Sequence, residues 1–169
     1  SSSMVTVTGT SEPNAVVTVI LDSGIAGTAT ADATGAWSLT LPATLSDGAH
    51  TVSARATDAA GNSGVVSAVN AFTVDTAAPA APIIVAPASN ALLSTATPAF
   101  SGTAEPGSTV TITIDGMPAG TVVADVLGRF SFTPATALPD GMHTVSATAR
   151  DTAGNTSPSS MPVSFTTDT

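Results

Sequence analysis

The 169-residue sequence contains no cysteine, no tyrosine and no lysine. Without cysteine there are no disulfides, thiolate metal sites or cysteine nucleophiles. Three arginines stand against twelve acidic residues, which gives a formal net charge of −9 at pH 7. Because binding to nucleic acid needs a cationic surface for the phosphates, this class of function is excluded.

Long apolar runs are also missing, although 43% of the residues are hydrophobic. No stretch approaches the roughly 20 apolar residues of a membrane-spanning helix, and the first residues lack the basic and apolar regions of a signal peptide. We therefore expect a folded chain with no membrane span, cut from a longer protein.

The sequence contains an internal repeat without gaps. Residues 1–76 align with residues 94–169 at a constant offset of 93 positions, as Gly9 does with Gly102. Such self-similarity is typical of tandem modules. We predict two domains, residues 1–76 and 77–169, joined by a proline-containing segment that the prolines hold extended.

The second copy begins with a segment that has no counterpart in the first. Residues 79–93, with the apolar run Ile83-Ile84-Val85, would correspond to positions before Ser1. The first module is therefore expected to lack its first strand, to have an uncovered sheet edge, and to be the less stable module. Both ends match the interior of a longer array of repeats, and we expect that array to be a rod.

Apolar and polar residues alternate with a period of two, which indicates half-buried strands. Turn-forming pairs such as Asp140-Gly141 separate these runs. The predicted strands of the second module lie near residues 83–86, 98–104, 109–115, 119–125, 129–133, 142–150 and 160–167. Seven short strands in roughly 90 residues predict an all-β fold, two tandem immunoglobulin-like antiparallel β-sandwich domains arranged end to end.

Few residues are suited to catalysis. His50 and His143 occupy equivalent positions in different modules, so they cannot meet in one site, and we expect each ring to pack beside a turn. No serine-nucleophile, zinc-protease or phosphate-loop motif occurs, so we predict that the chain is not an enzyme. The expected core aromatics are Trp37, Phe72, Phe130 and Phe165.

Four motifs occur in a fixed order, and three of them are complete in both copies. They are Gly-Thr-x-Glu-Pro at 9–13 and 102–106, Asp-Gly-x-His-Thr-Val at 47–52 and 140–145, Asp-x-Ala-Gly-Asn at 58–62 and 151–155, and a closing Asp-Thr-x-x-Pro at 75–79. These motifs resemble the bacterial immunoglobulin-like repeats of large secreted adhesins and biofilm-associated surface proteins.

The resemblance implies a non-catalytic stalk module of a bacterial cell-surface adhesin that mediates or spaces cell adhesion. Its partners would be the neighbouring repeats of the same chain, with receptors bound through other parts of the parent protein. The implied location is secreted or on the cell surface. Calcium often stiffens such arrays between modules.

All twelve acidic residues occur at corresponding positions in the two copies. Repeated carboxylates without partner cations are either turn formers or ligands for a cation such as Ca²⁺. The turn interpretation is favoured at Asp22, Asp115 and the Asp-Gly pairs that begin at Asp47 and Asp140. The predicted calcium ligands are Asp75, Glu105, Asp151, Asp125, Glu12 and Asp58.

These ligands are expected to form one site per module. Three loops meet the incoming linker at one end of a module, which would bring Asp75, Glu105 and Asp151 together. Asp125 would lie at the same end, where it also suits a turn. The first module lacks an incoming aspartate, so its set of Glu12, Asp58 and Asp32 should be weaker or empty.

The alternative function is a carbohydrate-binding module of a secreted polysaccharide-active enzyme. Such modules present exposed aromatic rings on which sugars stack. Trp37 is the only tryptophan and alternates with polar neighbours as a core residue does. The adhesin stalk is therefore preferred, and a Trp37 exposed on a flat sheet would favour the alternative.

Overall fold

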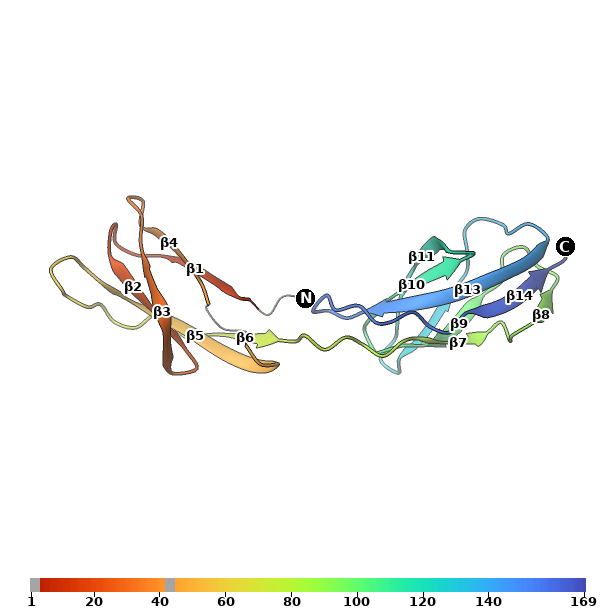
Figure 1. The fold of residues 1–169 in the computed structure, drawn as a ribbon, viewed down its shortest axis with the longest axis horizontal. Helices are drawn as coiled ribbons and strands as arrows, with labels where there is room; N and C mark the ends of the chain where they lie inside the picture. Colours follow the sequence, from red (N-terminus) through yellow and green to blue (C-terminus); the bar gives the residue numbers. More distant parts are fainter. Residues whose placement is uncertain (1–3, 42–44) are drawn as a thin grey trace. The chain divides into compact units, whose positions relative to one another are not determined.

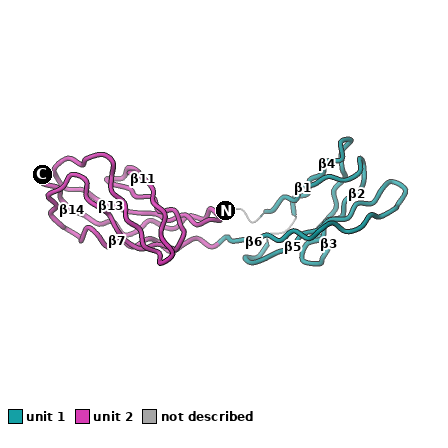
Figure 2. Tube along the Cα trace, turned by 180° about the vertical axis from the view of Figure 1, so that it is seen from behind, with its two compact units in different colours: residues 1–76 teal, residues 77–169 magenta. Residues whose placement is uncertain are grey.

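The computed structural model describes residues 4–41 and 45–169, and the chain divides into two compact units, Ser1–Thr76 and Ala77–Thr169 (Figure 2). The elements of the described residues are all β-strands (Figure 1), so the prediction of all-β domains is confirmed. Among the described residues, no helix has the length and apolarity to cross a membrane.

Unit 2 is a sandwich of a three-stranded and a five-stranded sheet. Its strands are β7 (Ile83–Ala86), β8 (Ala91–Leu93), β9 (Phe100–Thr103), β10 (Thr109–Ile114), β11 (Met117–Val123), β12 (Arg129–Phe132), β13 (Gly141–Arg150) and β14 (Val163–Thr167). The sheet orders are β12-β9-β7 and β11-β10-β13-β14-β8. Every pairing is antiparallel except that of β14 with β8.

The first strand of unit 2 divides between the two sheets. β7 pairs with β9, and after the cis bond between Ala86 and Pro87 the chain continues to β8, which pairs with β14. β8 was not predicted, because three residues in parallel pairing carry no periodic pattern. The other seven strands lie where the alternation of polar and apolar residues predicted them.

The core of unit 2 lies between these sheets. Phe130 and Phe165 are buried, as predicted, and Phe100 is an equally buried aromatic that the sequence analysis did not single out. The rings of Phe100 and Phe165 pack edge to face with their centroids 5.5 Å apart. Ala147 and Ala149 are also buried, and such small side chains let the two sheets approach closely.

Unit 1 repeats this arrangement with fewer strands. They are β1 (Thr6–Thr10), β2 (Val16–Leu21), β3 (Gly24–Thr30), β4 (Ala36–Thr40), β5 (Gly48–Thr57) and β6 (Asn70–Val74), in sheets β1-β4 and β3-β2-β5-β6. The described residues of unit 1 contain no counterpart of β7 or β8. The predicted uncovered edges are therefore present, on β1 and on β6.

The core of unit 1 is less complete than predicted. Val17 and Val19 are fully buried, but Trp37 and Phe72 are only partly buried, unlike their counterparts Phe130 and Phe165. Trp37 and Phe72 were expected among the main core aromatics, and in unit 1 they are less buried than their counterparts in unit 2. The described residues of unit 1 contain no counterpart of β8, which in unit 2 pairs with the strand that carries Phe165.

Candidate functional site

One repeated polar cluster lies at the tight turn between β2 and β3, and again between β10 and β11. Both central residues of each turn have positive φ: 46° and 70° at Asp22 and Ser23, 49° and 79° at Asp115 and Gly116. Two such residues form the turn type whose twist suits a hairpin. The turn interpretation of both aspartates is therefore confirmed.

Each turn aspartate also binds the histidine of the neighbouring strand. His50 Nδ1 lies 2.7 Å from Asp22 Oδ2, and its Nε2 lies 2.9 Å from the carbonyl oxygen of Ser46. Oδ1 of Asp22 accepts a hydrogen bond from the amide of Thr51. Because both partners of the ring can only accept, both ring nitrogens donate together only when the ring is protonated.

Unit 2 has the same cluster with a more deeply packed ring. His143 Nδ1 lies 2.6 Å from Asp115 Oδ2, and Nε2 lies 2.8 Å from the carbonyl oxygen of Pro139. The imidazole packs on Phe165 with ring centroids 5.5 Å apart, as His50 does on Phe72 at 5.6 Å. The expected structural role of both histidines is supported by these contacts.

The cluster shifts the pKa of its members in opposite directions. The hydrogen bond with the aspartate, followed by that with the backbone carbonyl, raises the pKa of His50 and of His143 above 6.5. The bonds from His50 and Thr51 lower the pKa of Asp22 below 3.8. Burial opposes the shift at Asp115, yet the bonds from His143 and Thr144 still lower the pKa of that carboxyl.

A second repeated contact holds the chain that leaves each unit. Oδ1 of Asp47 accepts hydrogen bonds from the amide and the hydroxyl of Thr76, both at 2.8 Å. Asp140 holds Thr169 in the same way, at 3.0 and 2.8 Å. The sequence analysis assigned these aspartates to turns and missed this contact. The signal was usable, because Asp47 precedes Thr76 by 29 residues and Asp140 precedes Thr169 by the same number.

Four of the other aspartates close loops within their own unit. Asp32 accepts from the amides of Thr34 and Ala36, and Asp125 accepts from those of Leu127 and Arg129. Asp58 binds both the amide and the side chain of Asn62, as Asp151 does with Asn155. These bonds, against the opposing effect of burial at Asp151, lower the pKa of Asp32, Asp58 and Asp151.

Within neither unit do the predicted calcium ligands form a cluster among the described residues. No three acidic or histidine side chains of one unit lie close enough together there to hold a metal ion. In unit 1, Glu12 and Asp58 line the same pocket. In unit 2, Glu105 lies beside Ala80 and Ala81 of the segment that leads into β7.

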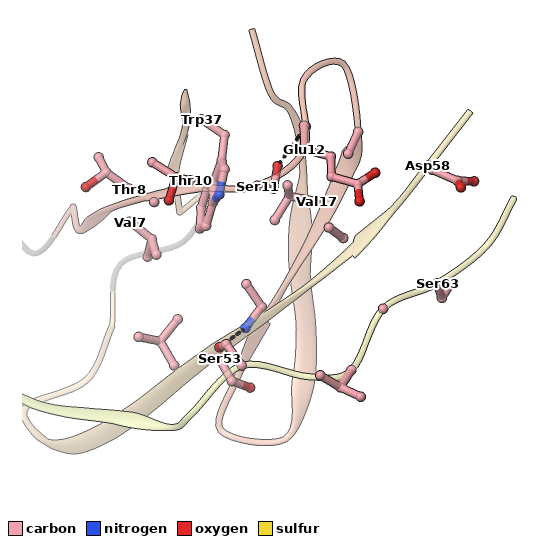
Figure 3. Close-up of a pocket in the computed structure, with 18 of the residues that line it drawn as sticks. Val7, Thr8, Thr10, Ser11, Glu12, Val17, Trp37, Ser53, Asp58 and Ser63 are labelled. Carbon is pink, nitrogen blue, oxygen red and sulfur yellow. Dashed lines mark hydrogen bonds between the residues drawn. The ribbon is translucent and has the colours of Figure 1, made fainter. Parts of the chain in front are cut away.

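Unit 1 contains a pocket of about 600 Å³ that the sequence analysis did not predict. Trp37 and Val17 line it, with Glu12 and Asp58 toward one end (Figure 3). The Trp37 ring lies across Gly9, its partner in the pairing of β1 with β4. Trp37 therefore lines a pocket and is partly buried. It does not lie exposed on a flat sheet, which is the position that would favour carbohydrate binding.

Solved structures that are similar to this chain come from more than one type of protein. The fibronectin(III)-like modules of Clostridium thermocellum CbhA align over 96% of this chain and 85% of theirs, with a TM-score of 0.60 and 19% identity. A tetra-tandem repeat from the extending region of a large adhesion protein is 30% identical over 99% of this chain and 46% of its own, with a TM-score of 0.44.

A biofilm-associated protein domain is 26% identical, with a TM-score of 0.41, over 97% of this chain and 27% of its own. The chain thus spans less than half the length of these last two structures. No protein of curated function matches the sequence. The profile of the bacterial Ig-like domain matches twice, at residues 2–76 and 86–169. The chain therefore belongs to the bacterial Ig-like domain family, as two tandem copies.

Proposed function

We propose that the chain is a non-catalytic stalk segment of a bacterial cell-surface adhesin, outside the cell, where its modules space an adhesive region from the surface. The family assignment and the repeated motifs support a structural module. The observation that carries the proposal is the pair of contacts by which Asp47 and Asp140 hold Thr76 and Thr169. Each copy fixes the chain where it leaves the sandwich, as a stalk that resists bending requires.

The two contacts allow a matched test of this role. Asp47→Ala frees Thr76, which lies directly before unit 2, whereas Asp140→Ala frees only the last residue of the chain. We expect Asp47→Ala to broaden the distribution of particle lengths in small-angle scattering and to raise the mobility of the Thr76 amide in NMR relaxation. Asp140→Ala should leave the scattering unchanged. If both variants and the unaltered chain scatter alike, the proposal is contradicted.

Calcium binding between modules stays a prediction. The position of Ala80 beside Glu105 supports it, because the incoming segment lies next to one predicted ligand. Asp125 and Asp151 already accept hydrogen bonds in their own loops, and within each unit the described acidic residues do not fit a complete calcium shell. Binding within one unit alone is therefore not proposed.

Thermal unfolding in millimolar calcium and in chelator tests the prediction. Calcium should raise the melting temperature of the unaltered chain, since a ligand that binds only the folded state stabilises it. Asp75→Ala should remove this rise. An unchanged melting temperature, or a rise that Asp75→Ala retains, means that these acids serve the loops alone.

A further inference from the structure

The ring of His50 is linked through one peptide group to the contact that holds the end of unit 1. Its Nε2 lies 2.9 Å from the carbonyl oxygen of Ser46. That carbonyl belongs to the peptide group whose nitrogen is the backbone nitrogen of Asp47, and the Asp47 carboxylate accepts the two hydrogen bonds of Thr76. A change at the ring that moves this carbonyl therefore also moves the backbone that carries the carboxylate.

The protonated ring of His50 fits its surroundings, and the neutral ring does not. Nδ1 faces the Asp22 carboxylate at 2.7 Å and Nε2 faces the Ser46 carbonyl, but a neutral imidazole has one N–H for these two acceptors. The bond to the carboxylate is charge-assisted and about twice as strong as a bond between neutral groups, so the neutral ring keeps its hydrogen at Nδ1. The lone pair of Nε2 then faces the oxygen of Ser46. Loss of one proton thus replaces an attraction at this loop with a repulsion.

Unit 2 holds the equivalent loop by a second hydrogen bond. Thr167 Oγ1 donates to the carbonyl oxygen of Pro139 at 2.6 Å, beside the contact of that oxygen with His143 Nε2. A threonine hydroxyl keeps its proton at every pH at which the fold is stable. Val74 occupies the position of Thr167 in unit 1, is buried, and has no hydroxyl to donate. The loop of unit 1 therefore depends more strongly on the charge of its histidine.

The groups around His50 determine where this charge changes. The turn between β2 and β3 contributes Asp22, β6 contributes the uncharged ring of Phe72, and the loop contributes the Ser46 carbonyl, with the Asp47 carboxylate one residue beyond. The hydrogen bond with Asp22, followed by that with Ser46, raises the pKa of His50 above 6.5, and burial opposes this shift. No other side chain of unit 1 titrates between about pH 5.5 and 8.5.

We propose that His50 makes the end of unit 1 pH-dependent: the charged ring keeps Asp47 in place to hold Thr76, and the neutral ring releases this contact. The release itself is a local property of unit 1. Its consequence rests on the proposed stalk function, under which the stalk is stiffer in mildly acidic surroundings and more flexible in mildly alkaline ones. The equivalent contact of Asp140 with Thr169 is expected to persist, because Thr167 still holds its loop.

NMR relaxation of the Thr76 methyl group measures the release in the whole chain, without the loss of amide signals at high pH. We expect its order parameter to fall between about pH 5.5 and 8.5, with a midpoint above 6.5, and to reach the value of the Asp47→Ala variant. The order parameter of the Thr169 methyl group should not change in this range.

Two variants separate the histidine from the loop. His50→Gln should make the Thr76 order parameter independent of pH, since no group then titrates beside the loop. Val74→Thr leaves His50 free to titrate but adds the hydroxyl that unit 2 has at this position, so Thr76 should stay held at pH 8.5. A histidine with a purely structural role would not give this rescue.

Three outcomes overturn the proposal. If Thr76 stays held at pH 8.5 in the unaltered chain while Asp47→Ala frees it, the stalk function stands and the pH dependence is wrong. If the order parameter still falls with pH in His50→Gln, another group such as the terminal amine is responsible. If Asp47→Ala leaves Thr76 unchanged at pH 5.5, the contact that carries the proposed function fails as well.

Discussion

At the scale of single residues, the histidine and aspartate at each hairpin act as one unit. Each aspartate shapes its turn and links it to the strand that carries the histidine. The ring in turn holds a backbone carbonyl through its other nitrogen. Since the arrangement repeats at an offset of 93 residues, it belongs to the module itself.

The opposite pKa shifts predict a pH dependence of stability. A raised histidine pKa stabilises the fold fully below pH 6.5, and this contribution is lost as the pH rises through the folded-state pKa. A lowered aspartate pKa stabilises above 3.8, and this is lost as the pH falls through the folded-state value. Both contributions are present between about pH 4 and 6.5.

We therefore expect the melting temperature to fall between pH 5.5 and 8.5. The chain has no cysteine, lysine or tyrosine, so its only side chains that titrate in this range are the two histidines. The double variant His50→Gln with His143→Gln should lose the slope. A slope that persists in the double variant assigns the effect to the terminal amine instead.

The two hairpins differ at one residue that is important for stability. Ser23 has a φ of 70°, a left-handed conformation that costs energy for a residue with a side chain, whereas Gly116 takes 79° without this cost. Ser23→Gly should stabilise unit 1 by about 0.5–1 kcal/mol, and Gly116→Ser should destabilise unit 2 by a similar amount. Chemical denaturation measures both, and a destabilising Ser23→Gly contradicts this account.

At the scale of elements, the units differ most at β7 and β8, which have no counterpart among the described residues of unit 1. Phe72 and Phe165 occupy equivalent positions, but only Phe165 has β8 beside its strand. Phe165→Ala should destabilise unit 2 by about 3–5 kcal/mol, the range for a fully buried phenylalanine. Phe72→Ala should cost unit 1 about 1–2 kcal/mol, because less apolar area is lost from burial. Equal losses would show that the strand does not determine burial at these positions.

The period of two predicted seven strands of unit 2 because that pattern is local to each strand. β8 and the pocket could not be predicted in this way. β8 depends on parallel pairing with a strand more than sixty residues away, and the pocket depends on how far Trp37 and Val52 are covered by other elements. The bond between Asp22 and His50 likewise follows from the pairing of β2 with β5, which places residues 28 positions apart side by side.

At the scale of the whole molecule, the two units have separate cores, and their stabilities should therefore be separate. The described residues of unit 1 contain no counterpart of β7 and β8, and its core is partly open, so we expect unit 1 to unfold first. Trp37 reports unit 1 alone, whereas circular dichroism in the far ultraviolet reports both units.

We expect the midpoint of the Trp37 transition to lie several degrees below the second transition seen by circular dichroism, since a difference of about 1 kcal/mol shifts the midpoint of a domain of this size by about 4–8 °C. Phe165→Ala should lower the second midpoint and leave the Trp37 midpoint in place, because the two sites are in different cores. Coincident transitions by both probes, or a Trp37 midpoint that moves with Phe165→Ala, would mean that the units unfold as one cooperative body and that the missing strand does not make unit 1 the weaker of the two.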